Sequence, residues 1–374
     1  MAIKILSDIV TVVSEHIANP STSEYDIFVG LEHYDAGEPV ITRYGSTAQL
    51  ESSVKHFNEG DILVARRNVY LKRAGVVKFE GVTSGDSIVL RVKDERYKAI
   101  IPFLLNTEEF WDYAEQNSDG TMSKRLAPDV LLEYECDIPD NHKEIADKLW
   151  AAYELKEAYK KMIAATDEMV KSQFIEMFGN PLSQEQKYPM RKLSECCIIN
   201  PRRTSVCLKD SDYVSFVPMP SVSENGTLQD VMDEEYGKVK KGFTYFENND
   251  VLFAKITPCM ENGKGAIAHS LTNGIGMGST EFHILRPIKG LSNPYWLLCL
   301  TRMPIFRKLA EKNMSGTGGQ KRVGAAFLEN FMIGLPPIEA QNTFEELYKQ
   351  ADKSKFELRQ AIEKIDKVMK SLLQ

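Results

Sequence analysis

Residues 246–255 read FENNDVLFAK, and residues 57–66 read FNEGDILVAR. Each stretch starts with phenylalanine, passes through a polar turn to an aspartate, and ends in an apolar run followed by a basic residue. A short apolar run bounded by turn residues is typical of a buried strand. The two stretches lie 189 residues apart, and a repeat of this kind indicates two copies of one structural unit.

The repeat continues on the C-terminal side of both stretches. Residues 75–92 (GVVKFEGVTSGDSIVLRV) and 265–287 (GAIAHSLTNGIGMGSTEFHILRP) share the order strand, glycine turn, Ser/Thr and strand. Residues 120–125 (GTMSKR) then match residues 316–322 (GTGGQKR). Each half finishes with an apolar strand, a proline and a long segment rich in charged residues. We therefore expect two similar globular domains.

Two segments without glycine or proline predict long helices, from about His142 to Phe178 and from about Ala340 to Leu373. Apolar residues of the second recur in a 3-4 pattern that predicts a coiled-coil seam in which only Ser354 is polar. The residues expected at an interface between the two helices are Leu149, Ala152, Tyr159, Ile163, Phe344, Leu347, Ala351, Leu358, Ile365, Val368 and Leu372. Periodicity alone also fits two ordinary amphipathic core helices.

These features predict an α+β protein with two globular domains in tandem repeat, each followed by a long helix. The two helices are expected to form an antiparallel coiled coil with pseudo-two-fold symmetry. The predicted boundaries are residues 1–140 and 179–338 for the globular domains, and 141–178 and 339–374 for the helices. A helix of about 35 residues is roughly 50 Å long. Helices of this length would hold the two domains about one or more turns of DNA apart, since a turn is ~34 Å.

The composition is typical of a soluble globular protein. The 374 residues are 43% hydrophobic and 26% charged, and no apolar run approaches the ~18 residues of a membrane-spanning helix. Asp8 and Glu15 interrupt the N-terminal segment, so a secretory signal is not expected and we place the protein in the cytoplasm. Six cysteines lack C-x-x-C spacing and nearby histidines, which predicts free buried thiols rather than zinc: Cys136, Cys196, Cys197, Cys207, Cys259 and Cys299.

Charge is distributed unequally along the chain. The formal net charge is -7, but residues 1–140 hold 14 Lys+Arg against 24 Asp+Glu, whereas residues 179–338 hold 19 against 15. A protein that binds nucleic acid needs a basic surface. The first domain can supply one only through a local patch.

Several short segments resemble enzyme motifs without their full context. The glycine-rich residues 274–278 precede a predicted strand rather than a helix, so no helix N-terminus is available for a phosphate. Asn293-Pro294 is better explained as a helix start, and residues 319–322 lack the order of a P-loop. Glu154 and Lys156 form a nuclease-like Glu-x-Lys on a predicted helix. No Ser/His/Asp or Cys/His arrangement is found either, so we expect no catalytic activity and no metal site.

Three loops in each half carry side chains suited to DNA, in which base edges are read by hydrogen bonds and phosphates bind Lys and Arg. Residues 66–73 concentrate four basic residues in the otherwise acidic first domain. The candidate DNA-binding residues of the first half are Arg43, Arg66, Arg67, Asn68, Tyr70, Lys72, Arg73, Ser123, Lys124 and Arg125. Those of the second half are Arg202, Arg203, Lys255, Thr257, Glu261, Asn262, Lys264, Ser279, Thr280, Gln320, Lys321 and Arg322. Solvated turns are the alternative explanation for such loops.

Residues 253–265 (FAKITPCMENGKG), followed by 278–282 (GSTEF) and the strand end 285–287 (LRP), resemble the target recognition domain of type I restriction-modification specificity subunits. Residues 28–33 (FVGLEH), with 60–63 (GDIL) and 84–86 (SGD), are similar to another version of that domain. The resemblance covers nearly the whole chain, including both helices.

The resemblance implies a non-catalytic subunit in which each recognition domain reads one half of a split double-stranded DNA target and the helix pair sets the gap. It also implies two methyltransferase subunits as partners, which transfer methyl from S-adenosylmethionine to adenine N6, with or without a restriction or motor subunit that uses ATP and Mg. Those cofactors would belong to the partners, and no membrane is involved.

Two other functions stay open at this point. One is a stand-alone DNA methyltransferase or nuclease fragment, and the other is a coiled-coil adaptor that does not contact DNA. Turnover of S-adenosylmethionine by the chain alone would favour the first. Unchanged DNA affinity after replacement of Arg66, Arg67 and Lys72 by alanine would favour the second.

Overall fold

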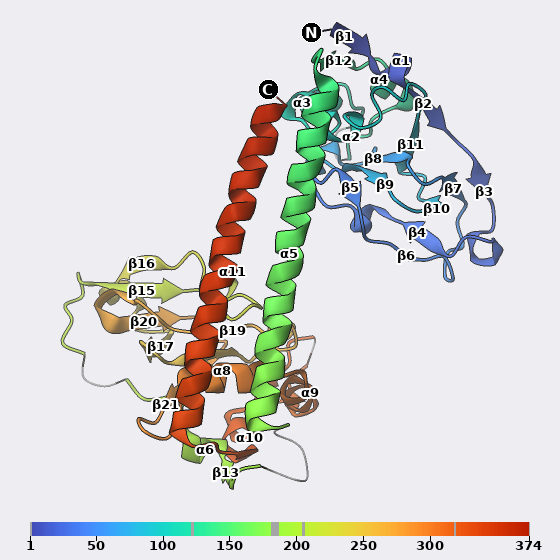
Figure 1. The fold of residues 1–374 in the computed structure, drawn as a ribbon. Helices are drawn as coiled ribbons and strands as arrows, with labels where there is room; N and C mark the ends of the chain where they lie inside the picture. Colours follow the sequence, from blue (N-terminus) through green and yellow to red (C-terminus); the bar gives the residue numbers. More distant parts are fainter. Residues whose placement is uncertain (1, 121–122, 181–186, 204–205, 318, 374) are drawn as a thin grey trace. The chain divides into compact units, whose positions relative to one another are not determined.

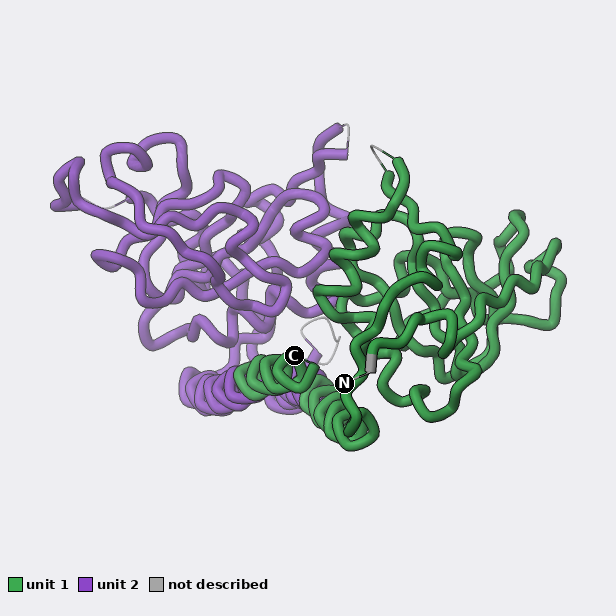
Figure 2. Tube along the Cα trace, turned by 90° about the horizontal axis from the view of Figure 1, so that it is seen from above, with its two compact units in different colours: residues 1–160, 359–374 green, residues 161–358 purple. Residues whose placement is uncertain are grey.

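The computed structural model describes residues 2–120, 123–180, 187–203, 206–317 and 319–373. Three residues of the repeated stretches, Thr121, Met122 and Gly318, lie outside these ranges. The chain divides into two compact units, residues 1–160 with 359–374 (unit 1) and residues 161–358 (unit 2) (Figure 2). Each unit contains part of both long helices, whereas the predicted boundaries treat the helices as separate segments.

The elements of unit 1 are short strands and helices that precede the first long helix (Figure 1). They are β1 (Ala2–Ile5), α1 (Leu6–Ile9), β2 (Val10–Val13), β3 (His16–Ile17), β4 (Ile27–Val29), β5 (Val40–Ile41), β6 (Gly45–Ser46), β7 (Val54–Phe57), β8 (Ile62–Ala65), β9 (Ala74–Val77), β10 (Gly81–Thr83), β11 (Ser87–Val92), α2 (Ile101–Leu104), α3 (Glu108–Gln116), α4 (Pro128–Leu132) and β12 (Glu135–Ile138).

The elements of unit 2 follow a similar order. They are β13 (Met190–Lys192), α6 (Leu193–Cys196), β14 (Cys197–Ile199), β15 (Tyr213–Val217), β16 (Met232–Glu235), α7 (Tyr236–Val239), β17 (Thr244–Glu247), β18 (Val251–Ala254), β19 (Gly265–Ile267), β20 (Ile275–Gly278), β21 (Phe282–Pro287), α8 (Pro294–Arg302), α9 (Pro304–Lys312), β22 (Met314–Ser315), β23 (Arg322–Val323), α10 (Ala325–Asn330) and β24 (Met332–Gly334). The two long helices are α5 (His142–Phe178) and α11 (Ile338–Leu372). The α+β class and the long C-terminal helix are confirmed.

The two units share the pairings of their central strands. In unit 1 the sheets have the orders β2-β11-β8-β9-β5 and β3-β7-β10-β4-β6, and in unit 2 they have the orders β14-β21-β18-β19 and β16-β15-β20-β17. β10 pairs with β7 antiparallel and with β4 parallel, and β20 pairs in the same two ways with β17 and β15. A separate ladder joins the first strand of each unit to its last, β1 to β12 and β13 to β24.

The repeated stretches 57–66 and 246–255 lie at the centre of the two units. In β8, Ile62 and Val64 belong to the core beneath the helices, while Leu63 and Ala65 belong to the core between the sheets. In β18, Val251 and Phe253 alternate in the same way with Leu252 and Ala254. A strand covered on both faces has apolar side chains at every position, which explains the uninterrupted runs ILVA and VLFA.

The phenylalanine that starts each stretch packs over a glycine of the neighbouring strand. Phe57 pairs with Gly81 and Phe246 with Gly276. A Cβ atom added at Gly276 would lie 2.0 Å from Cε2 of the Phe246 ring, and one added at Gly81 would lie 3.0 Å from Cζ of Phe57. Only glycine fits beneath these rings without displacement.

Within each unit, the segments of the two long helices contact each other, and the order of the contacts along the chain is antiparallel. In unit 1, Nζ of Lys156 on α5 lies 2.7 Å from Oδ1 of Asp366 on α11, and Leu149 shares a core with Met369. In unit 2, Nζ of Lys355 on α11 lies 2.8 Å from Oδ1 of Asp167 on α5. Phe174 and Phe344 meet edge to face at 5.3 Å between ring centres.

The buried stripe of α11 differs in part from the predicted seam. Phe344, Ala351, Leu358, Ile365 and Leu372 are buried or half-buried, but Val368 is 54% exposed and Ser354 is exposed. The alternate positions of the stripe are instead Tyr348, Lys355 and Met369, with Leu347 only half-buried. The prediction of Val368 is wrong because the alternate positions of the stripe are shifted by one residue, from Ser354 to Lys355 and from Val368 to Met369. A lysine is not expected in an apolar stripe, but ion pairs with Asp167 and Asp352 offset the cost of burying Lys355.

On α5, Leu149 is fully buried, whereas Ala152, Tyr159 and Ile163 are half-buried. None of the helices that the structure describes is long and apolar enough to cross a membrane.

Candidate nucleic-acid interface

The loop after β8 in unit 1 is held by backbone hydrogen bonds to the segment that ends in Leu126. The N–H of Arg66 donates to the carbonyl of Asp86 at 2.9 Å, and the N–H of Leu126 donates to the carbonyl of Arg66 at 2.9 Å. The N–H of Asn68 donates to the carbonyl of Lys124, also at 2.9 Å. Two of the predicted loops, 66–73 and 123–125, are thus brought side by side.

Polar side chains of these two loops form one network. Nε of Arg67 donates to Oγ of Ser123 at 3.1 Å, and Oγ of Ser123 donates to Oδ1 of Asn68 at 3.1 Å. Asp86 lies between two arginines, 3.2 Å from Nη2 of Arg125 and 3.6 Å from Nη1 of Arg67. A hollow of about 480 Å³ is lined by Arg66, Arg67, Asp119, Gly120, Ser123, Arg125 and Ala127.

The other candidate residues of unit 1 lie outside this network or are occupied by other partners. Nη2 of Arg43 lies 2.7 Å from Oδ1 of Asp35, and Lys72 forms an ion pair with Glu108 on α3. Arg73 donates to the backbone carbonyls of Leu31 and Arg67, and burial lowers the pKa of its guanidinium. Nζ of Lys124 donates to the carbonyl of Glu115 at 3.0 Å, while Tyr70 is 56% exposed.

Unit 2 repeats the backbone arrangement after β18. The N–H of Lys255 donates to the carbonyl of Glu281 at 2.9 Å, and the N–H of Val323 donates to the carbonyl of Lys255 at 2.9 Å. The N–H of Thr257 donates to the carbonyl of Lys321 at 3.0 Å. Lys255 therefore corresponds to Arg66 of unit 1, and Arg322 to Arg125.

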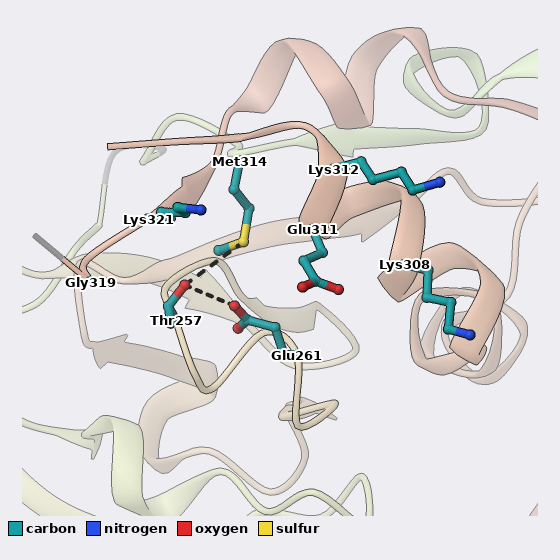
Figure 3. A pocket seen from close by; sticks show the side chains of 8 residues that line it. All are labelled: Thr257, Glu261, Lys308, Glu311, Lys312, Met314, Gly319 and Lys321. Atoms are coloured by element: carbon teal, nitrogen blue, oxygen red, sulfur yellow. Dashed lines mark hydrogen bonds between the residues drawn. The ribbon is translucent and has the colours of Figure 1, made fainter. Parts of the chain in front are cut away.

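The loop of unit 2 borders a hollow of about 570 Å³ (Figure 3). Oγ1 of Thr257 donates to Oε1 of Glu261 at 2.8 Å, beside the sulfur of Met314. The remaining lining residues are three lysines, Lys308, Lys312 and Lys321, together with Glu311 and Gly319. Lys308 and Lys312 were not predicted from the sequence, although their spacing of four residues puts them on one face of a helix.

An arginine beneath the loop holds it from inside. Nη1 of Arg307 on α9 donates to the carbonyl of Met260 at 2.7 Å, and its guanidinium lies 4.5 Å from the centre of the Phe253 ring. Arg307 is 5% exposed, and burial lowers the pKa of its guanidinium. The backbone of residues 260–264 is therefore fixed by a side chain that solvent barely reaches.

The other candidate residues of unit 2 have different surroundings. Nη1 of Arg203 donates to the carbonyl of Lys240 at 2.8 Å, and Arg202 is exposed. Oγ of Ser279 accepts a hydrogen bond from the N–H of Glu281 at 3.2 Å. The carbonyl of Lys264 accepts one from Nη2 of Arg307 at 3.4 Å. Asn262, Thr280 and Gln320 are exposed.

Two smaller predictions concern the cysteines and the enzyme-like segments. All six cysteines are free, and Cys136, Cys196 and Cys197 are buried, but Cys207 is exposed, so its predicted burial is wrong. Among the described residues, no His, Cys, Asp and Glu side chains gather in a group that could hold a metal ion. Asn293 caps α8 through a hydrogen bond of 2.9 Å from the N–H of Tyr295 to Oδ1 of Asn293, as predicted.

Residues 185–367 match the protein family described as "Type I restriction modification DNA specificity domain". This match covers just under half of the chain, so the similarity to the type I specificity family concerns its second half. The chain is 41% identical over 150 residues to the specificity subunit of the Escherichia coli type I restriction enzyme EcoEI, and 44% identical over 133 residues to that of EcoAI. These segments cover 40% and 35% of the chain, but only 25% and 23% of the two relatives.

Two solved structures resemble this chain in fold. One is the type I restriction-modification S subunit from M. genitalium, with a TM-score of 0.56, 10% identity and coverage of 100% of this chain and 94% of that one. The other comes from work on "complex assembly and conformational transition of the type I R-M system", with a TM-score of 0.55, 16% identity and coverage of 100% and 96%. At these identities the likeness concerns the fold alone.

Proposed function

We propose that this chain is the sequence-specific DNA-binding subunit of a type I restriction-modification complex, and that each unit reads one half of a bipartite target. The observation that carries the proposal is the repeated frame after β8 and β18, where Arg66 and Lys255 stand at the same place in two networks of basic and polar side chains. A protein that reads two half-sites needs two such surfaces.

In this proposal residues 1–140 and 179–338 are target recognition domains, and residues 141–178 and 339–374 are spacer helices. The helices would pair as an antiparallel coiled coil with pseudo-two-fold symmetry along their whole length and set the distance between the half-sites. The contacts Lys156–Asp366 and Lys355–Asp167, one in each unit, support antiparallel pairing.

The chain itself would be non-catalytic. Two methyltransferase subunits would bind it and transfer methyl from S-adenosylmethionine to adenine N6, which requires the adenine to leave the base stack. ATP and Mg would be used by a restriction subunit where one joins. The complex would act on DNA in the cytoplasm.

Methylation mapping of host DNA tests the target: we expect one bipartite adenine motif that disappears when the gene for this chain is deleted. Incubation of the purified chain alone with labelled S-adenosylmethionine and DNA should give no product. Turnover by the chain alone would contradict the non-catalytic role.

Binding variants test the surfaces. Arg67→Ala in unit 1 and Lys321→Ala in unit 2 should each weaken DNA binding by the assembled complex and flatten its salt dependence by about one counterion. Lys93→Ala and Lys289→Ala are matched controls, because these exposed lysines follow the far ends of β11 and β21, whose near ends adjoin Asp86 and Glu281. Equal effects of controls and test variants would contradict the assignment of these surfaces.

A further inference from the structure

The side chains of Arg322 and Glu281 meet edge to edge in unit 2. Nε of Arg322 donates to both carboxylate oxygens of Glu281, at 3.1 and 2.9 Å, and Nη2 donates to Oε1 at 2.7 Å. The backbone of Glu281 is itself held, because its N–H donates to Ser279 and its carbonyl accepts from Lys255. The guanidinium thus has a fixed orientation although 41% of the side chain is exposed.

Glu281 occupies only one edge of that guanidinium. Among the described residues, the other edge, formed by Nη1 and the outer hydrogen of Nη2, makes one long contact of 3.4 Å, from Nη1 to the carbonyl of Gln320. A rigid fork of two parallel N–H groups matches two acceptors that lie side by side. In the major groove of DNA, guanine presents such a pair, O6 and N7.

The charge of the pair favours a base over a phosphate. Arg322 and Glu281 together carry no net charge, so a phosphate contact would release little counterion. The directional N–H groups remain, and the acceptors of a guanine edge are uncharged. Lys321 next to it is exposed, and no carboxylate pairs with it among the described residues. It is the better phosphate ligand.

Unit 1 contains the corresponding pair. Nη2 of Arg125 lies 3.2 Å from Oδ1 of Asp86, and the carbonyl of Asp86 accepts from Arg66 as that of Glu281 accepts from Lys255. Asp86 also faces Arg67 at 3.6 Å, so its hold on Arg125 is looser. The arginine is 53% exposed.

We propose that Arg322 reads a guanine in the major groove through its free edge, with Glu281 as the positioning residue, and that Arg125 with Asp86 does the same in the other half-site. This inference rests on the proposed function and adds the base and the atoms that are read.

The test uses the full chain assembled with its methyltransferase partners and duplexes that carry the mapped target. Each guanine is replaced in turn by 7-deazaguanine, which lacks N7. At one guanine of the half-site read by unit 2, the wild-type complex should lose about ten-fold in affinity. The Arg322→Ala complex should bind the normal duplex about ten-fold more weakly and lose nothing further at that guanine.

Salt dependence separates a base contact from a phosphate contact. Arg322→Ala should leave the slope of log affinity against log salt unchanged, whereas Lys321→Ala should reduce it by about one. Glu281→Gln keeps the shape of the side chain but removes its negative charge, so the positive charge of Arg322 is no longer neutralised. It should steepen the slope by about one and reduce the penalty for 7-deazaguanine. A purely structural role for Glu281 would not steepen the slope.

Three results would overturn the inference: a half-site for unit 2 without guanine, no effect of 7-deazaguanine at any position in a complex that binds its target specifically, or a reduced salt slope in Arg322→Ala. Failure of the wild-type complex to prefer its mapped target would instead overturn the proposed function itself. The two failures are therefore distinguishable.

Discussion

Arg286 binds Asp250 through two parallel hydrogen bonds, from Nε to Oδ1 at 2.8 Å and from Nη2 to Oδ2 at 2.7 Å. Oδ2 of Asp250 also accepts from the N–H of Glu247 at 2.7 Å, so one carboxylate joins β21 to the turn between β17 and β18. Unit 1 has the same arrangement, in which Arg91 binds Asp61 at 2.8 and 2.7 Å and Asp61 accepts from the N–H of Asn58.

Asp250→Asn should destabilise unit 2 by about 2–4 kcal/mol, because Asp250 is 1% exposed and its loss leaves a mostly buried guanidinium without its main partner. Urea denaturation followed by tryptophan fluorescence measures the change, because Trp296 is 1% exposed in the core of unit 2. Lys238→Met, which removes an exposed pair with Glu235, is the control and should change stability by less than about 0.5 kcal/mol. Similar effects of both variants would show that the buried pair does not stabilise the turn.

Gly276→Ala should destabilise unit 2 by about 1–3 kcal/mol, since its Cβ would overlap the Phe246 ring. Gly324→Ala is the matched control, because Gly324 has a φ of -75° and nothing lies within 4 Å of an added Cβ. Thermal unfolding compares the two. If Phe246→Leu does not reduce the effect of Gly276→Ala, the ring is not its cause.

Unit 2 should lose stability between pH 7 and pH 5. Burial lowers the pKa of His283 from its usual 6.5, and burial likewise lowers that of His269. The folded state thus binds a proton less readily than the unfolded state, so this stability is complete above the unfolded pKa and is lost as pH falls through it. Neutral His283 is satisfied on both nitrogens, with Nε2 donating to the carbonyl of Val323 at 2.8 Å and Nδ1 accepting from Asn200 at 2.9 Å.

Urea midpoints across that pH range measure the effect, and His283→Gln should make the dependence shallower but not abolish it, because His269 still titrates. Lys241→Gln, an exposed site, should leave the dependence unchanged. An unaltered pH profile in His283→Gln would contradict this assignment.

The register of the stripe on α11 can be tested with two adjacent residues. Met369→Lys should destabilise unit 1 by more than about 2 kcal/mol, because Met369 is 9% exposed and packs in the core. Val368→Lys should change stability by less than about 0.5 kcal/mol, because Val368 is 54% exposed. Circular dichroism during heating compares the stabilities of the two variants. A larger loss of stability in Val368→Lys would support the seam predicted from the sequence, which contains Val368.

Repeated residues of the two halves take matching positions because each has a local physical role. Phe246 needs Gly276, and Asp250 needs Arg286, so these pairs recur at matching positions in both halves. The seam of α11 was harder to predict because Lys355 is charged and yet buried. Its partner Asp167 lies 188 residues away in sequence, where no local pattern indicates it.

The candidate interface was predicted by loop but not by side chain. Basic residues such as Lys72 and Arg43 look equivalent to Arg67 in sequence. Glu108 and Asp35 each neutralise one of the first two, whereas Arg67 shares the single carboxylate of Asp86 with Arg125. The acidic partners decide which cations remain available, and each lies on a separate element. Asp86 and Glu281 could have been found by asking which acidic residues occupy equivalent places in the two repeats.

The frame that holds the loops after β8 and β18 consists of main-chain N–H and carbonyl groups, from Arg66 to Leu126 and from Lys255 to Val323. Main-chain bonds do not depend on the identity of the side chain, and only proline lacks the donor. Substitution in these loops can therefore alter the outward-facing chemistry while the scaffold keeps its shape. For a subunit proposed to recognise DNA, this allows new target preferences to evolve by exchange of a few surface residues, without a new fold each time.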